Sequence, residues 1–245
     1  MAQANATSWY PSVALNKSPA FAQRALETSA QSLCRSLLWA AALAGVLQVG
    51  AVQADGLQTL ENFLRTTRTG RADFTQVVTS PPREGQAPRS KQSSGSFEFQ
   101  RPNRFRFTYT KPFVQTLVAD GQTLWLHDPD LNQVTARRQA QVLASTPAAL
   151  IATAPDLAAL RQEFELAAAP DREGLQGVQA TPRARDGALR GVRVGFRGAD
   201  LAALEIQDSL GQQSVMRFGR MEINLAMPAD TFQFRPPPGA DVLRP

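Results

Sequence analysis

The residues that could carry acid–base chemistry in this chain are few. His127 is the only histidine, and Asp128 follows it directly. A histidine that acts as a base needs a carboxylate that meets it in space. Neighbouring residues on a strand point to opposite faces, so we interpret His127 as an ordinary histidine at the end of a strand. A single histidine also excludes the usual zinc sites, which are built from several His and Cys ligands.

The sequence also lacks the motifs of common enzyme classes. No Gly-rich segment ends in the Gly-Lys pair followed by Ser or Thr that cradles phosphates, and no Gly-x-Ser-x-Gly nucleophile elbow occurs. The prediction is a protein that is not an enzyme and that has no catalytic residues, metal or cofactor.

A pattern near the start indicates export from the cytoplasm. Arg35 precedes the apolar run of residues 36–47, which is too short to span a bilayer, and the small residues of Val52-Gln53-Ala54 follow it. This pattern predicts a secretory signal peptide over residues 1–54 and a single domain over residues 55–245.

Two features complicate the signal peptide, its distance from the start of the chain and the absence of any methionine between Met1 and Met216. The apolar run begins unusually far from Met1, which we interpret as a translation start placed too far upstream. The alternative is an uncleaved membrane anchor, but Gln48 and Gly50 interrupt the apolar run. We therefore expect cleavage before Asp55.

Removal of this leader changes the composition. Cys34 is the only cysteine and precedes the apolar run, so the processed chain has no cysteine, no disulfide and no acylated N-terminal cysteine. The leader holds three of the 26 Lys and Arg residues and one of the 21 Asp and Glu residues, which leaves 23 against 20 and a net charge of +3. This mild charge, with no basic block, predicts no nucleic-acid partner.

Alternation of polar and apolar residues dominates the rest of the chain. Phe97 and Phe99 share one face of a predicted strand, and Phe105, Phe107 and Tyr109 share one face of the next. Turn signals recur at short spacing. The pattern predicts a mainly β protein, a long antiparallel meander that closes or half-closes into a barrel or a curved sheet. Further strands are expected over residues 113–119, 123–127, 133–137, 163–168, 175–181, 189–197, 204–207, 213–218, 221–225 and 231–234.

Helical spacing is confined to short segments. Residues 55–67 carry Leu57, Leu60, Phe63 and Leu64 at the spacing of an amphipathic helix. Two shorter helices are expected over residues 147–154, which contain Leu150 and Ile151, and over residues 157–160 after an Asp156 cap. The polar residues from Ser80 to Ser94 predict a long mobile hairpin loop.

Four segments in order resemble a known family. They are Asp73-Phe-Thr-Gln76, Gly95-Ser-Phe-Glu-Phe-Gln-Arg-Pro-Asn-Arg-Phe105, Leu117-Val-Ala-Asp-Gly-Gln-Thr-Leu-Trp125 and the C-terminal stretch from Phe232 to Leu243. Together they resemble the periplasmic outer-membrane lipoprotein carrier LolA family. The resemblance implies an incomplete, strongly curved antiparallel β-barrel with a helical lid over an apolar cavity for acyl chains.

The resemblance also implies partners. Such a carrier takes acylated lipoproteins as cargo from an inner-membrane ABC transporter complex and hands them to an outer-membrane lipoprotein acceptor. It works in the periplasm, and we expect a monomer.

The resemblance assigns roles to particular residues. Arg101 matches a family arginine associated with holding the lid closed, and a guanidinium can bond carbonyls freed at helix ends. The alternative for Arg101 is an ordinary arginine in a turn, with its charged group in water. The alternative for the aromatic residues is that they fill a dry core and line no cavity. The cavity is expected to involve Phe97, Phe99, Phe105, Phe107, Tyr109, Leu117 and Trp125, and the lid Leu60, Phe63, Leu64, Leu150 and Ile151.

Other classes of function remain open at this stage. A periplasmic binding protein for another lipid or a glycolipid would need the same fold and cavity. A secreted enzyme would depend on His127, and a purely structural periplasmic protein would bind no acyl chains.

Overall fold

The structure, a computed structural model, describes residues 55–82, 87–142, 154–185 and 187–244. The predicted signal peptide, residues 147–153 of the helix predicted over residues 147–154, and the expected lid residues Leu150 and Ile151 lie outside the described residues. Within the described ranges, no helix has both the length and the apolar character needed to cross a membrane.

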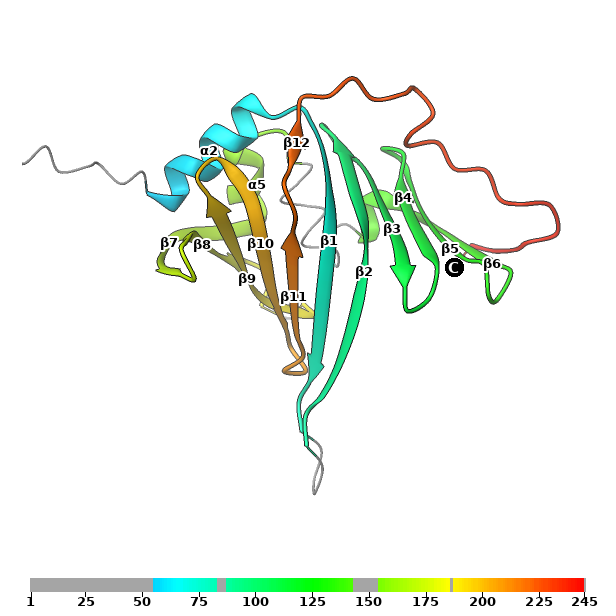
Figure 1. Ribbon diagram of the computed structural model, residues 1–245, viewed down its shortest axis with the longest axis horizontal. Coiled ribbons are helices and arrows are strands. Elements are labelled where there is room, and N and C mark those ends of the chain that lie inside the picture. The colour runs from blue at the N-terminus through cyan, green and yellow to red at the C-terminus, as the bar shows by residue number, and fades with distance from the viewer. Residues whose placement is uncertain (1–54, 83–86, 143–153, 186, 245) are drawn as a thin grey trace, which may run out of the picture. The chain divides into compact units, whose positions relative to one another are not determined.

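One large sheet forms the body of the protein (Figure 1). Its strand order is β13-β6-β5-β4-β3-β2-β1-β11-β10-β9-β8-β7, with β12 paired to β1. The pairs are antiparallel except for β13 against β6. The predicted β meander is therefore confirmed, as an open curved sheet that does not close into a barrel. The strands are β1 Thr69–Ser80, β2 Arg89–Gln100, β3 Arg104–Lys111, β4 Gln115–Ala119, β5 Thr123–Asp128, β6 Gln133–Arg138, β7 Phe164–Arg172, β8 Leu175–Pro182, β9 Leu189–Arg197, β10 Asp200–Asp208, β11 Gln213–Phe218, β12 Glu222–Ile223 and β13 Asp241–Leu243.

The two faces of this sheet differ in character. We call the face that carries Phe97, Phe107 and Val194 the inner face, because their side chains belong to one core cluster that also includes the apolar side of a helix. The opposite face, which carries Arg193 and Trp125, is the outer face. The alternation of apolar and polar residues along each strand produces this division.

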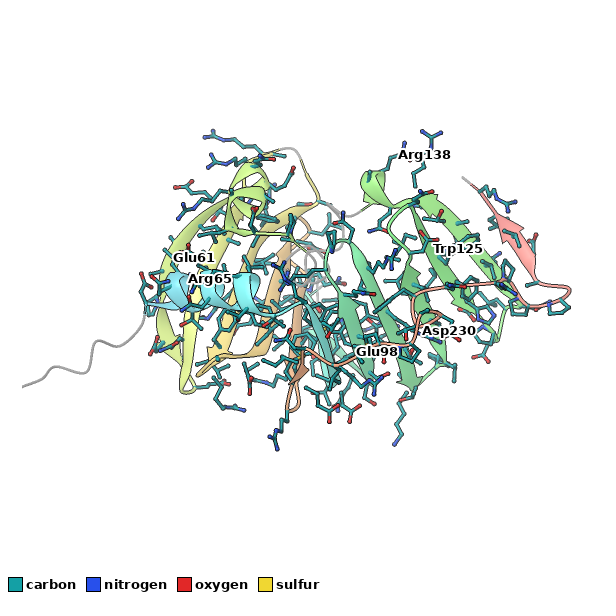
Figure 2. All side chains as sticks on the ribbon, turned by 90° about the horizontal axis from the view of Figure 1, so that it is seen from above. Glu61, Arg65, Glu98, Trp125, Arg138 and Asp230 are labelled. Atoms are coloured by element: carbon teal, nitrogen blue, oxygen red, sulfur yellow. The ribbon has the colours of Figure 1, made fainter. Side chains whose placement is uncertain are left out.

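Helix α2 (Gly56–Thr66) covers part of the inner face, over β7, β8 and β9. Asp55 caps it by accepting a hydrogen bond from the Leu57 N–H at 3.3 Å. Its apolar stripe is buried, whereas Glu61 and Arg65 are exposed on its other side (Figure 2). The predicted helix over residues 55–67 is thus confirmed. The other described helices are α3 (Gln139–Val142) and α5 (Leu157–Glu163), and Asp156 caps α5 as predicted.

The predicted mobile loop from Ser80 to Ser94 is wrong for residues 89–94, which belong to β2. Strands β1 and β2 continue as a paired hairpin as far as Ser80 opposite Arg89, while residues 83–86 lie outside the described part. Most side chains from Arg89 to Gln92 are exposed, and paired backbone groups rather than apolar burial hold the strands together. Strand β1 itself was not predicted, because its apolar residues alternate only near Ala72 and Phe74.

The C-terminal segment also departs from the prediction. Residues 231–234 are not a strand. Residues 224–244 run past β3 to β6 and end in β13, which pairs in parallel with β6 (Figure 1). Phe232 is nevertheless buried, so the apolar residues in this segment serve packing rather than strand pairing.

Candidate functional site

A cluster of phenylalanines covers the centre of the inner face. The strand register places Phe97 opposite Phe107 and Phe99 opposite Phe105. The ring centroids of Phe97 and Phe107 lie 4.4 Å apart, and those of Phe97 and Phe99 lie 5.7 Å apart. These four side chains are almost fully buried. The structure therefore brings together four of the expected cavity residues, and in this state their own rings fill the space between them.

Tyr109 and Leu117 extend this cluster toward the far end of β3 and β4. Both are half-buried and pack against the core. The Tyr109 hydroxyl donates a hydrogen bond to Gln76 Oε1 at 3.0 Å, and burial raises the pKa of this phenol. Leu126, which pairs with Leu117, is 40% exposed. The inner face thus changes from a closed aromatic centre to a partly open aliphatic end.

The structure corrects the expected position of Trp125. This residue pairs with Val118, whereas Leu117 and Ala119 face inward opposite Phe107 and Phe105. Because successive strand residues alternate in direction, Trp125 lies on the outer face. There its ring lies 5.6 Å from Phe234 of the C-terminal segment, which passes Trp125 in Figure 2. Sequence alternation could not reveal this face, because it depends on the register between β4 and β5.

The expected lid residues on α2 do lie on the inner face. Leu60, Phe63 and Leu64 are buried in the core. The Phe63 ring lies 5.7 Å from Phe196 of β9 and 6.3 Å from Phe99 of β2. Phe63 therefore links the two halves of the curved sheet.

Two glycines allow this close packing. A Cβ atom at Gly56 would lie 2.4 Å from the carbonyl oxygen of Gly177, so only glycine lets the start of α2 reach the backbone of β8. A Cβ atom at Gly70 would lie 2.4 Å from the Phe99 ring. Gly70 in β1 therefore provides the space that this ring occupies.

Arg101 connects the two helical segments beside the core. It follows β2 in the turn before β3, and its side chain is only 7% exposed. Its Nε donates to the carbonyl oxygen of Thr67 at 2.8 Å, just after α2, and its Nη1 donates to the carbonyl oxygen of Ala154 at 2.6 Å, just before α5. One guanidinium thus bonds backbone at the end of one helix and ahead of another.

The surroundings of Arg101 are largely aromatic. Its Cζ lies 5.1 Å from the centroid of the Phe63 ring and 5.2 Å from that of Phe99, a cation–π arrangement. Burial, and then the nearby charge of Arg68, lower the pKa of Arg101 to about 10. The guanidinium therefore stays charged at neutral pH. No described residue accepts a hydrogen bond from its buried Nη2.

A polar pocket of about 450 Å³ adjoins Arg101, lined by residues 100–104 and 120–122 of two neighbouring turns. Gln139 ties these turns together, because its Nε2 donates to the Asn103 carbonyl and its Oε1 accepts from the Gly121 N–H. Its side chain was not singled out from the sequence, and an isolated glutamine gives no signal of such a role.

Asp120 organises the second of these turns. Burial alone would raise its pKa, but hydrogen bonds from the Thr123 and Gln122 N–H groups and from the Trp125 indole outweigh this effect and lower the pKa. This carboxylate thus fixes the start of β5 and the orientation of Trp125.

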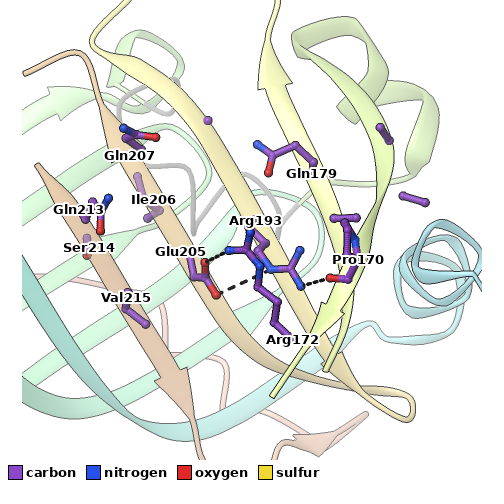
Figure 3. A pocket seen from close by; sticks show the side chains of 14 residues that line it. Pro170, Arg172, Gln179, Arg193, Glu205, Ile206, Gln207, Gln213, Ser214 and Val215 are labelled. Atoms are coloured by element: carbon purple, nitrogen blue, oxygen red, sulfur yellow. Dashed lines mark hydrogen bonds and ion pairs between the residues drawn. The ribbon is translucent and has the colours of Figure 1, made fainter. Parts of the chain in front are cut away.

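A second pocket, of about 520 Å³, lies on the outer face across β7 to β11 (Figure 3). Its lining combines charged and polar side chains with small or apolar ones such as Ala168, Ile206 and Val215. Arg193 donates from Nη2 to the Pro170 carbonyl oxygen at 2.6 Å and lies 3.8 Å from Glu205, which also approaches Arg172 at 4.0 Å. These charges compensate one another, and such a surface does not suit acyl chains.

His127 lies away from both pockets. Its ring contacts Phe234 at a centroid distance of 5.7 Å on the outer face. Within the described ranges, no group of three or more His, Cys, Asp or Glu side chains could hold a metal ion.

Several inner-face residues were not singled out from the sequence. Phe74 packs edge-on against Phe107 at 5.7 Å, and Phe196 meets α2 through Phe63. Val192, Val194 and Phe196 alternate in a segment that was correctly predicted as a strand, so their pattern could have placed them in the core.

Fold and site together define a class, the half-barrels in which an open antiparallel sheet curves around an apolar inner face beneath a helix. Residues 65–235 match the family model described as outer membrane lipoprotein carrier protein LolA. The chain belongs to this family.

Named relatives agree with the match. An outer-membrane lipoprotein carrier protein of Albidiferax ferrireducens is 64% identical over 199 residues, which cover 80% of this chain and 93% of that protein. An outer-membrane lipoprotein carrier protein of Methylibium petroleiphilum is 53% identical over 209 residues, which cover 85% of this chain and 98% of that protein. Among solved structures, a LolA superfamily protein of Nitrosomonas europaea aligns with a TM-score of 0.45 and 12% identity over 74% of this chain and 98% of that one.

Proposed function

We propose that this protein carries acylated lipoproteins through the periplasm. It takes them from an inner-membrane ABC transporter complex and delivers them to an outer-membrane lipoprotein acceptor. The observation that carries the proposal is the family match over residues 65–235, together with relatives named outer-membrane lipoprotein carrier proteins. We further propose that the protein works as a monomer and that it is not an enzyme.

The physical need for such a carrier follows from its cargo. Each buried methylene of an acyl chain is worth about 0.8 kcal/mol, so a lipoprotein with several chains cannot cross water unaided. In our proposal, the chains bind against the inner face, where Phe97, Phe99, Phe105 and Phe107 form an apolar surface. Tyr109 and Leu117 extend this surface toward the exposed Leu126.

Loading of acyl chains requires α2 and the aromatic rings of the inner face to move apart. The aromatic rings of the inner face are packed on one another and buried, so acyl chains must separate α2 from the sheet and replace ring contacts. Helix α2 would then act as the lid. It would move away from the sheet and cover the acyl chains with the side chains of Leu60, Phe63 and Leu64. Leu150 and Ile151 remain predicted lid residues outside the described part of the chain.

Arg101 is the proposed gate. Its bonds to the Thr67 and Ala154 carbonyls exist only while both helical segments lie beside it. Opening must break them, and a ligand shifts an equilibrium only by its difference in affinity for the two states. Bonds of this kind therefore keep cargo affinity low enough for release without a nucleotide.

The periplasmic location is part of the same proposal. Residues 1–54 would direct export and be removed, and the domain of residues 55–245 would work between the membranes. The relatives' names concern the outer membrane, and no described helix is suited to span a bilayer.

The alternative, a binding protein for another lipid or a glycolipid, is not favoured because the relatives are named as lipoprotein carriers. The test is mass spectrometry of the protein purified from periplasm after crosslinking. We expect covalently trapped acylated lipoproteins. Recovery of a glycolipid or of no acylated partner, from protein that is folded and abundant, would contradict the proposal.

A further inference from the structure

Arg101 lies at a boundary between two environments. On one side the Phe63 and Phe99 rings flank its guanidinium and lead into the apolar core. Arg101 also lines the polar pocket formed by residues 100–104 and 120–122. A bound acylated molecule has the same division, since its hydrocarbon chains are apolar and the group that joins them is polar.

The hydrogen-bonding capacity of Arg101 is only partly used. Nε and Nη1 donate to the Thr67 and Ala154 carbonyl oxygens, whereas the buried Nη2 has no acceptor in the described part of the chain. Buried charged donors are normally satisfied, and an exception calls for an explanation such as a missing ligand. The free donor is thus a second observation that points to a ligand, independent of the neighbouring pocket.

The chemistry of the missing acceptor can be narrowed. Arg68 adds a second positive charge nearby, which favours an electron-rich oxygen over a further donor. If acyl chains occupy the inner face beside Phe99, the first polar atoms at the boundary are the carbonyl oxygens of the esters that join the chains to glycerol. A carbonyl oxygen is an acceptor without a donor, which matches a guanidinium N–H.

We propose that Nη2 of Arg101 donates a hydrogen bond to an ester carbonyl oxygen of the bound lipoprotein's diacylglyceryl group. Arg101 then contacts the cargo in the loaded state and holds the helical segments in the closed state. This inference rests on the proposed carrier function and adds to it a specificity-determining contact.

The test compares two synthetic peptides that differ only at these oxygens. One carries a dipalmitoylglyceryl thioether on its N-terminal cysteine, and the other carries the same chains through ether links, which lack the carbonyls. A hydrogen bond to a charged group predicts that the wild-type protein binds the ester peptide about tenfold more tightly than the ether peptide. Both complexes require the same opening of the lid, so the ratio of affinities isolates the proposed contact.

Variants of Arg101 test whether this residue causes the difference in affinity between the ester and ether peptides. In Arg101→Met the two peptides should bind equally, whatever the change in absolute affinity. Arg101→Lys keeps the positive charge but lacks the several N–H donors of a guanidinium, so it should also lower the affinity ratio. It replaces Arg101→Met in the test if that variant fails to fold. Arg197→Met, a change at an exposed residue at the end of β9, should retain the full ratio. Free diacylglycerol and its diether analogue, measured in parallel, separate recognition of the acyl esters from recognition of the peptide.

The outcomes separate the two proposals. Equal binding of ester and ether peptides by the wild-type protein would overturn this inference and leave the carrier function standing. A tenfold ratio that persists in folded Arg101→Met would also overturn it, because another group would then supply the contact. Failure of the wild-type protein to bind any of the acylated probes would instead count against the carrier function itself, and the inference would fall with it.

Discussion

Arg101 and Ala154 are joined by a hydrogen bond of 2.6 Å from the guanidinium Nη1 to the carbonyl oxygen, although 53 residues separate them in the chain. The same guanidinium bonds the Thr67 carbonyl at the end of α2. The segments before α5 and after α2 are therefore both bonded to one side chain.

Arg101→Leu should leave the fold intact and disturb transfer. Without the two lid bonds, opening becomes easier, so the variant should hold cargo more persistently and deliver it poorly. We expect the loss of two closed-state bonds to outweigh the loss of one cargo contact, because the individual bonds to the guanidinium are of similar strength. A reconstituted assay would measure loading from inner-membrane vesicles and delivery to the acceptor separately, with Arg197→Leu, a change at an exposed residue at the end of β9, as the control. Normal delivery by well-folded Arg101→Leu would show that the gate lies elsewhere.

Phe63→Ala should destabilise the protein by about 3–5 kcal/mol, because it removes a buried ring between the two halves of the sheet. Phe113→Ala is the matched control. Phe113 is 67% exposed, so its removal should change the free energy of unfolding by less than about 0.5 kcal/mol. Urea denaturation of the processed protein measures both. Similar values for the two variants would contradict the assigned position of α2.

Phe234→Ala should shift the emission of Trp125 to longer wavelength, because Phe234 covers the indole on the outer face. Trp9 and Trp39 lie in the predicted leader, so Trp125 is the only tryptophan of residues 55–245. Fluorescence of the processed protein is therefore specific for this contact. An unchanged spectrum would mean that the C-terminal segment does not cover Trp125 in solution, and Phe113→Ala should leave the spectrum unaltered.

Asp120→Asn should destabilise the protein at neutral pH and have little effect in acid. The pKa of Asp120 is lower in the folded protein than its ordinary value of 3.8, so the folded state favours the carboxylate. Its contribution is fully present above the unfolded-state pKa and is lost as the pH falls through the lower folded-state pKa. The variant also places an amide N–H₂ or a weaker acceptor against the Trp125 and backbone donors.

The check for Asp120 is thermal unfolding of wild-type and variant proteins from about pH 7 to about pH 2.5, a range that brackets the carboxyl titration. The difference in Tm should narrow as the pH falls. Asp130→Asn, at an exposed residue, provides the control for a general loss of charge. A difference that stays constant with pH would contradict the role assigned to the ionised form.

Processing should yield a protein that begins at Asp55 and needs no detergent. The Val52-Gln53-Ala54 sequence after the apolar run motivates this prediction. Intact mass measured on periplasmic extract tests it. A membrane-bound product that retains residues 36–54 would contradict it.

The sequence by itself determined strands β3 to β11 and the chemistry of the β2 and β3 faces, but not β1 or β13. Alternation along residues 95–100 and 104–109 was enough to place Phe97, Phe99, Phe105 and Phe107 on apolar faces, because side-chain direction follows the period of a strand. Helical spacing likewise identified Leu60, Phe63 and Leu64 on the packed side of α2.

Tertiary structure decided what those faces meet. Trp125 turns outward because of the register between β4 and β5, and the residues from Arg89 to Ser94 are a strand because β1 supplies backbone partners. The bonds from Arg101 to Thr67 and Ala154 depend on three segments far apart in the chain. Local propensity carries no information about such partners, since register and long-range contacts are set by the packing of the whole sheet.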